Sequence, residues 1–355
     1  MWKEGVECNK EGVAADEKYV RLSKNENQFY KFYRMHNMHF VVWCAMFEGQ
    51  YNTAMEYARM MEERNPAGDK DSGVQFMLAG CIPMGAVFLE SYVTSPWHVM
   101  VRFGKWDDII SEPLRTDKAV FPNVMVVQHY ARGVAYASKG LVPEAEAELA
   151  KFLEARQNVD GPVPMAARVQ HNVPVTKQHD IQEKILVGEI EYRKAFLAKK
   201  DGQQADFEKA WVPLYEAIDL SLNLPYNEPW GQMQPVRHIL GALKLEQGEV
   251  DEAEAIYRAD IKLWKDNMWG LLGLKNCLKK KGNQVEYDQV QAKFEAASAR
   301  ADEVPTVTCL CAQPVAAGCC GAQAEKTSET WSWTNAYPVV LAVIASGFFA
   351  YKRMR

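Results

Sequence analysis

Cysteine is scarce in this chain, with eight residues among 355. Small secreted domains that depend on disulfide bonds have a far higher density of cysteine, so a disulfide scaffold is excluded. An excess of basic residues is also missing, because 46 acidic residues stand against 41 lysines and arginines, for a formal net charge of -5. Non-specific nucleic-acid binding requires a basic face that displaces counterions, so we expect no nucleic-acid partner.

Familiar catalytic motifs are absent as well. The sequence contains no HExxH motif, no cue for a Ser-His-Asp triad, no glycine-rich phosphate loop and no CxxC pair. These absences favour a binding protein over an enzyme, without excluding an enzyme. Asn-x-Ser/Thr sequons are missing too, which agrees with a body of the protein that never enters the secretory lumen.

The apolar content of 48% is too high for a disordered chain, and the length suits one large domain or two ordinary ones. The mean hydropathy of -0.31 conceals an apolar C-terminal end. The stretch 333–351 carries no charge and spans about 28 Å as a helix, and three of the last four residues, Lys352, Arg353 and Arg355, are cations.

This C-terminal pattern predicts a transmembrane helix with a basic tail over 333–355, and a buried core helix is the alternative. Its position at the extreme C-terminus predicts a single-pass tail anchor with a cytosolic body. The short span and basic tail favour the mitochondrial outer membrane or the peroxisome over the ER. The membrane is thus one expected partner.

The body of the chain repeats a pattern of 34 residues. Residues 126–159 and 234–267 place glycine at positions 8 and 15 and alanine at position 20, as the tetratricopeptide pattern does. Residues 35–68 share the glycine at 15 and the alanine at 20, and degenerate units begin near Glu90 and Ile181. Small residues at 8 and 20 let paired helices approach closely, and the glycine at 15 turns the chain between them.

The repeats predict an all-α fold: a tetratricopeptide-type α-solenoid, which is a right-handed superhelix of antiparallel helix pairs, followed by the C-terminal transmembrane helix. We expect a solenoid over 1–302, a flexible linker rich in Cys, Gly and Ala over 303–332, and the anchor over 333–355. Residues 1–19 have the pattern of the second helix of a repeat, and no first helix precedes them. We therefore expect the first repeat to be truncated.

Several longer motifs add a resemblance. They are HN-x-HF-x3-A-x-M-x-G from His36, V-R-F-G-x-W from Val101, R-G-x-A-x-A-x-x-G from Arg132 and L-P-Y-x-E-P from Leu224. With these motifs the body, over roughly 1–311, resembles tetratricopeptide-repeat proteins of a largely bacterial-type subgroup. The resemblance implies the fold, and it implies no particular activity. The membrane tail is an addition to that pattern.

In such repeats, positions 2, 5, 9 and 12 of the first helix face a concave groove. The candidate groove residues, for a peptide or other ligand, include these positions and Trp230 from the proline-rich loop 224–237: His36, His39, Trp43, His98, Tyr130, Glu189, Trp230 and His238. The favoured function is a membrane-tethered scaffold that binds a protein or peptide partner through this groove, with no cofactor.

The alternative is a metal-binding or hydrolase-like enzyme. His36 and His39 share one helix face at a spacing of three, and His98 or Glu189 could complete a site for a divalent ion such as Zn or Fe. In the predicted linker, Cys309, Cys311, Cys319 and Cys320 are candidate lipidation sites close to the membrane, and incidental thiols or a redox pair are the other interpretations. Their spacing, CxC followed by CC, is not a common zinc pattern, which disfavours a zinc site there.

Overall fold

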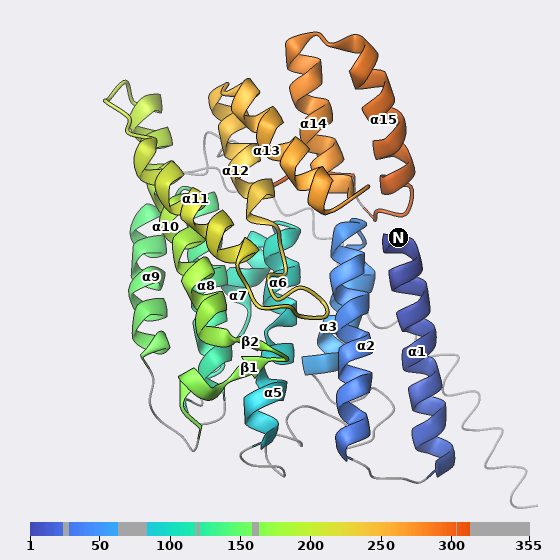
Figure 1. Ribbon diagram of the computed structural model, residues 1–355. Coiled ribbons are helices and arrows are strands. Elements are labelled where there is room, and N and C mark those ends of the chain that lie inside the picture. Colours follow the sequence, from blue (N-terminus) through green and yellow to red (C-terminus); the bar gives the residue numbers. More distant parts are fainter. Residues whose placement is uncertain are drawn as a thin grey trace, which may run out of the picture. The chain divides into compact units, whose positions relative to one another are not determined.

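In the computed structural model, residues 1–23, 28–62, 84–116, 118, 121–157, 163–302 and 304–312 are described. Helices dominate, and helices that follow one another in the chain lie side by side (Figure 1). The elements are α1 (Trp2–Ser23), α2 (Gln28–Phe47), α3 (Tyr51–Glu62), α5 (Met84–Val93), α6 (Ser95–Arg102), α7 (Trp106–Ser111), α8 (Pro122–Ser138), α9 (Val142–Arg156), η1 (Met165–Ala167), β1 (Val169–Gln170), β2 (Val173–Pro174), α10 (Val175–Lys200), α11 (Glu208–Leu222), α12 (Val236–Gln247), α13 (Val250–Leu263), α14 (Met268–Lys281), α15 (Gln284–Ser298) and η2 (Leu310–Ala312).

Glycines form the turns between paired helices. A backbone with positive φ is costly for any residue that has a Cβ, so glycine is the residue that ends a helix and reverses the chain. Positive φ angles occur at each turn glycine that the repeat pattern places at position 15 and at the turn of the last pair: Gly49, Gly104, Gly140, Gly248 and Gly282. The predicted turns are therefore confirmed.

Glycines at position 8 allow close packing. The Tyr257 ring on α13 lies against both Gly241 on α12 and Gly273 on α14. A Cβ at Gly241 would come within 2.6 Å of the Tyr257 ring, and one at Gly273 within 2.2 Å. Both distances are below van der Waals contact, so a bulky, fully buried tyrosine is held between two helices that lack side chains at these points.

The array of helix pairs closes on itself. The indole Nε1 of Trp269, on α14, donates a hydrogen bond of 2.8 Å to the Met46 carbonyl near the end of α2. The amide of Asp302, which follows α15, donates to the Gly49 carbonyl at 3.1 Å. In an open solenoid each repeat contacts only its neighbours. Here the pair α2–α3 contacts the end of the array.

The fold class predicted from the sequence, a tetratricopeptide-type α-solenoid followed by a transmembrane helix, is therefore wrong as stated. The described chain is a helical array whose first and last pairs contact each other. Among the helices of the described residues, none combines the length and the apolar character needed to cross a membrane. The longest of them, α10, carries Lys, Glu and Arg along its length. The predicted span over 333–355 lies outside the described residues.

A short β-hairpin also departs from the all-α prediction. Strands β1 and β2 pair antiparallel, with Val169 opposite Pro174 and Gln170 opposite Val173. The hairpin packs on α5, where Ser91 Oγ donates to the Val169 carbonyl at 3.3 Å. A salt bridge between Arg168 and Glu90, both 1% exposed, joins the base of the hairpin to the same helix.

The predicted linker begins inside the packed unit. Residues 304–312, which we call the inner segment, contact α8 and α12 and contribute Cys309 and Cys311 to the largest apolar core. The compact unit therefore continues past residue 302, where the linker was predicted to begin. The rest of the predicted linker, from 313 on, lies outside the described residues.

Candidate functional site

The inner segment is held by hydrogen bonds from helices that are far apart in the sequence. Thr308 Oγ1 donates to the His238 carbonyl of α12 at 2.8 Å and lies 2.6 Å from the Tyr257 hydroxyl of α13. The Thr308 carbonyl accepts from Arg102 of α6 at 3.4 Å. A single threonine thus links three helices.

The end of the segment is fixed in the same manner. Arg193 on α10 donates from Nη2 to the Cys311 carbonyl at 2.7 Å. Leu310 fills the space beside Gly104, where a Cβ would come within 2.5 Å of its side chain. Two of these contacts go to backbone carbonyls of the segment, at Thr308 and Cys311, and the others use the side chains of Thr308 and Leu310.

Three predicted groove residues lie along this inner segment. Glu189 and Tyr130 are buried beside Cys309 and Cys311. His238 is fully buried, but its side chain turns away toward α13, where Nε2 lies 2.8 Å from Asp260 Oδ2. The predicted groove positions therefore face the interior of the array, and the chain's own segment lies against them.

The remaining groove residues gather around α2, under the loop 224–237, which we call the covering loop. His39 is fully buried, and its Nε2 lies 3.2 Å from the sulfur of Met233 in the covering loop. Trp43 packs edge-on against Trp264, with ring centroids 5.6 Å apart, and Trp230 packs on the same ring at 4.9 Å. The predicted residues thus divide into two groups, each covered by a different part of the chain.

A cluster of histidines lies beneath the covering loop. His171, at the tip of the β-hairpin, packs edge-on against His36 with ring centroids 5.2 Å apart, and its Nε2 lies 2.5 Å from the Tyr92 hydroxyl. His39 stacks on His171 at 6.4 Å. His98 of α6 is near enough to His39 to affect its charge. These four residues are the histidine cluster.

Burial keeps His39, His98 and His171 neutral at physiological pH. It lowers the pKa of His98 to about 4 and, with repulsion from His36, lowers the pKa of His171 to about 4. The pKa of His39 falls well below its usual value for the same reason, with added repulsion from neighbouring histidines. Neutral imidazoles can accept hydrogen bonds or bind a metal ion.

The predicted metal ligands His36, His39 and His98 are neighbours, but they do not converge on one point. Among the described residues, only Glu189, Cys309 and Cys311 bring three potential ligand atoms within 4.8 Å of one another. His39 and His171 instead use ring nitrogens toward Met233, Gln170 and Tyr92. The arrangement connects α2 to the hairpin and the covering loop.

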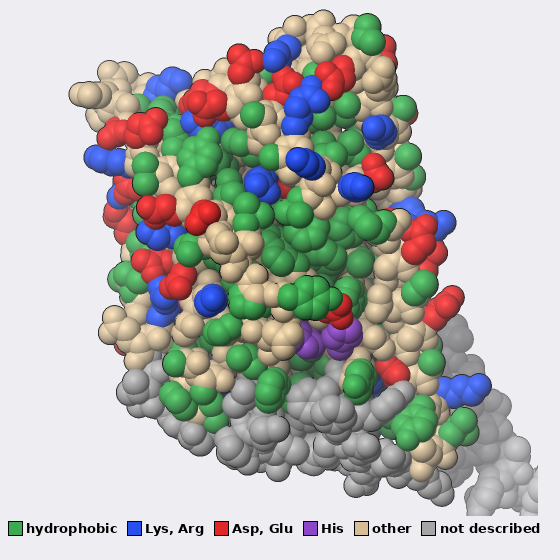
Figure 2. Space-filling view, in the orientation of Figure 1, with side chains coloured by type: hydrophobic (Ala, Val, Ile, Leu, Met, Phe, Trp, Pro, Cys, Tyr) green, Lys and Arg blue, Asp and Glu red, His purple; other side chains and the backbone are tan. Residues whose placement is uncertain are grey.

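An open pocket lies beside this cluster. It has a volume of about 490 Å³ and is lined by α2, by the covering loop and the end of α11, and by the end of α13: Phe40, Trp43, Leu222, Leu224, Pro225, Tyr226, Asn227, Glu228, Pro229, Trp230, Leu263 and Trp264. Tyr226 on the covering loop is 73% exposed. Figure 2 shows apolar side chains gathered at the centre of this face. We call the pocket lined by these residues the aromatic pocket.

The predicted lipidation sites fall into two groups. Cys309 and Cys311 form a disulfide bond and are buried, so their sulfurs are not available to carry an acyl chain in this structure. Cys319 and Cys320 lie outside the described residues.

Sequence reasoning missed His171 and the proximity of Glu189 to the cysteine pair. His171 adopts a φ of 52°, in the left-handed region that a non-glycine residue rarely takes. The two-residue His171–Asn172 turn between short β-forming stretches was a signal that could have revealed a hairpin. The distance of over a hundred residues between Glu189 and Cys309 left no local signal.

Comparison with known protein families, with curated proteins and with solved structures finds no match for this chain.

Proposed function

We propose that this chain is a protein-interaction module, built from tetratricopeptide-like helix pairs, that takes up an apolar side chain of an extended partner peptide in the aromatic pocket. The carrying observation is the pocket itself: three tryptophans, from α2, the covering loop and the end of α13, border an open volume of about 490 Å³. Aromatic residues bury a large apolar area and dominate the energetics of protein interfaces.

The chain's own contacts support the choice of a peptide partner. Side chains of this array already hold backbone carbonyls of the inner segment, as Arg102 does at Thr308 and Arg193 does at Cys311. The inner segment lies against that part of the predicted groove, so we propose that a partner binds at the aromatic pocket. Pro225 and Pro229 restrict the covering loop, which reduces the entropy lost when a partner binds.

The test is selection of peptides from a random displayed library on the full chain, followed by affinity measurements on synthetic copies. We expect the selected peptides to share an apolar anchor and to change the fluorescence of the pocket tryptophans. Tyr226→Ser and Trp230→Ala should each weaken binding at least about tenfold, as expected for residues that anchor an interface.

Tyr215→Ser is the matched control, since Tyr215 is an exposed tyrosine on α11 that does not line the pocket. Its affinity should equal that of the unmodified chain. Selected peptides that bind both pocket variants with unchanged affinity would overturn the proposal. Because Tyr226 is largely exposed, its replacement leaves the fold intact and the result interpretable.

A further inference from the structure

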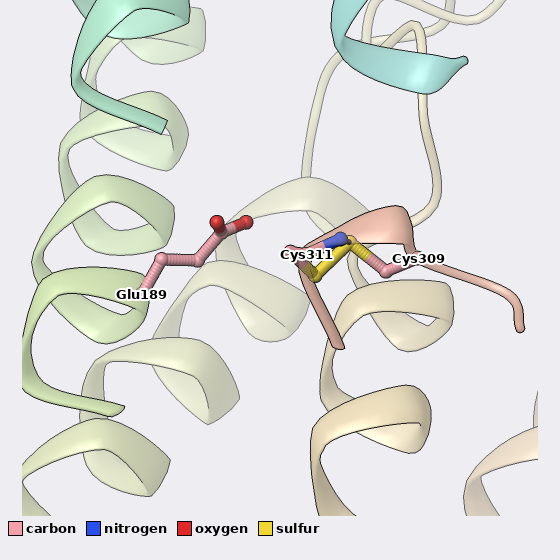
Figure 3. A group of neighbouring side chains, drawn as sticks. All are labelled: Glu189, Cys309 and Cys311. Atoms are coloured by element: carbon pink, nitrogen blue, oxygen red, sulfur yellow. Dashed lines mark hydrogen bonds between the residues drawn. A yellow bond between two sulfur atoms is a disulfide. The ribbon is translucent and has the colours of Figure 1, made fainter. Parts of the chain in front are cut away.

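Glu189 is an unusual residue for its position. Its side chain is 4% exposed on α10, and within the described residues its carboxylate accepts no hydrogen bond. Figure 3 shows this carboxylate pointing from the helix toward Cys311 on η2 and Cys309, which directly precedes η2. A buried carboxylate that accepts no hydrogen bond and has only the charge of Arg193 nearby is costly and calls for an explanation.

The three side chains are arranged as a potential ligand set. One carboxylate oxygen and the two sulfurs lie within 4.8 Å of one another, and all three residues are buried. Thiolates with a carboxylate are ligands that zinc accepts in tetrahedral sites, at about 2.3 Å for sulfur and about 2.0–2.2 Å for oxygen. Small movements of the side chains would bring the ligand atoms to these distances around one ion.

The neighbouring charges fit a divalent ion. Two thiolates and a carboxylate carry three negative charges, and Arg193, one helical turn after Glu189, contributes one positive charge beside Cys311. A divalent cation neutralises the two negative charges that remain, and a buried site requires such compensation of charge. In the disulfide form the two thiolates, and their negative charges, are absent.

A cavity lies beside the inner segment. It has a volume of about 680 Å³, opens between α12, α13 and α14, and is bordered by Val307, Thr308 and Ala312, the neighbours of the cysteine pair in the chain. The cysteines and Glu189 are not part of its lining, so solvent in this cavity reaches the segment that carries the pair but not the pair itself.

We propose that Glu189, Cys309 and Cys311 form a zinc site that assembles when the Cys309–Cys311 disulfide is reduced. A dithiol reductant gives up two electrons and two protons, becomes a disulfide itself, and leaves two cysteine thiols. Zinc then binds the two sulfurs and the Glu189 carboxylate and releases the thiol protons to solvent. The fourth position of a tetrahedral site remains for water.

The experiment uses cobalt(II) as a probe, since thiolate ligation produces an intense charge-transfer absorption that imidazole or carboxylate ligands do not. The full chain is reduced with dithiothreitol, freed of reductant without oxygen, and titrated with cobalt and then with zinc. We expect one cobalt per chain in the reduced protein, displacement by zinc, and no charge-transfer band in the oxidised protein.

Variants assign the ligands. Cys309→Ser and Cys311→Ser should each abolish or strongly reduce the band, and Glu189→Gln should weaken cobalt binding at least about tenfold, since even residues that only orient a ligand cost that much. Cys277→Ser is the matched control, because Cys277 is a free, buried cysteine outside this cluster. A double variant Cys319→Ser/Cys320→Ser tests the other cysteine pair, and both controls should keep the band.

Absence of a band in the reduced, unmodified chain would overturn the proposal. So would a band that survives both single cysteine variants, or one that disappears in the Cys319→Ser/Cys320→Ser variant alone. Far-UV circular dichroism of each variant shows whether it is folded, and Glu189→Gln, which keeps the side-chain shape, decides the case if the cysteine variants do not fold. The result does not depend on peptide binding at the aromatic pocket.

Discussion

Two parts of the chain cover the predicted groove, and they do so by different contacts. The covering loop lies over α2 mainly through rings and sulfur, as in Trp230 on Trp264 and Met233 against His39. The inner segment lies among α6, α8, α10, α12 and α13 through hydrogen bonds to its backbone, as from Arg193 to the Cys311 carbonyl, and through the hydroxyl of Thr308 and buried apolar side chains. The first covering leaves the aromatic pocket open, and the second borders a separate cavity with α12, α13 and α14.

The two kinds of contact suit the covering loop and the inner segment to different tasks. Side-chain packing depends on shape, so the covering loop defines a specific apolar pocket beside it. Backbone contacts tolerate many sequences, so the inner segment can place chemically special residues, the cysteine pair, against Glu189. Each covering can be weakened separately, and the predictions below run from the largest expected effect to the smallest.

The largest effect is expected at the buried ion pair between Arg168, at the base of the β-hairpin, and Glu90 on α5. Arg168→Met leaves the Glu90 carboxylate buried without its cation, and loss of one partner of a buried pair costs about 3–5 kcal/mol. Urea unfolding followed by circular dichroism should show this loss. Lys184→Met, which breaks a largely exposed pair with Glu216, should cost about 1 kcal/mol or less. Equal losses would contradict the structural role of the buried pair.

The corresponding test near the inner segment is Gly273→Ala. The new methyl group would collide with the Tyr257 ring, and overpacking of this kind costs about 1–3 kcal/mol. The ring cannot move without disturbing the bond between its hydroxyl and Thr308. Hydrogen exchange should therefore increase at 304–312 in this variant, and unchanged protection there would contradict the coupling between Tyr257 and the inner segment.

Acid should weaken the covering-loop side through the histidine cluster. His98 has a folded pKa of about 4 against an ordinary value of 6.5, so the unfolded chain takes up the proton first as the pH falls. The contribution of His98 to the unfolding free energy is complete above pH 6.5 and declines as the pH falls toward 4. Between pH 7 and pH 5 it amounts to about 2 kcal/mol of unfolding free energy.

His98→Gln should therefore reduce the loss of stability between pH 7 and pH 5. The measurement is the unfolding free energy of both proteins at the two pH values, by urea titration. His129→Gln is the control, because that histidine lies beside Glu148 and outside the cluster. An identical pH dependence for His98→Gln and the unmodified chain would show that His98 titrates normally in the folded state.

The smallest expected effect is that of Thr308→Val. The substitution keeps the side-chain shape but removes the hydroxyl that donates to the His238 carbonyl, which costs about 1 kcal/mol. Protection from hydrogen exchange should fall at the inner segment and stay unchanged at the covering loop. Thr53→Val, at a weak 3.5 Å contact with Lys10, should leave both regions as they are. Equal loss of protection at both coverings would show that they are not independent.

Much of the local structure could be predicted from the sequence, because it depends on single residues. Gly49 and Gly248 end helices where the repeat pattern places turns, and Gly241 lies where two helices approach. The closure of the array could not be predicted in this way. It depends on Trp269 reaching Met46, and a pattern with a period of 34 residues carries no information on contacts between its first and last copies.

The candidate site was predictable only in part, for a similar reason. Groove positions follow from helix geometry, so Glu189 and Trp43 were found. What faces them comes from outside the repeats, since Met233 lies in a connecting loop and Cys311 lies beyond the last helix. His171 belongs to a two-residue turn in a hairpin too short to show an alternating pattern.

The contact between Trp269 and Met46 also bears on how the chain unfolds. A linear stack of repeats can unravel from either end, one pair at a time, because a terminal pair is held on one side only. Here the α2–α3 pair and the end of the array hold one another through residues more than 220 positions apart. Neither end can then fray without breaking the other's contacts, so unfolding becomes a single cooperative transition of the whole array.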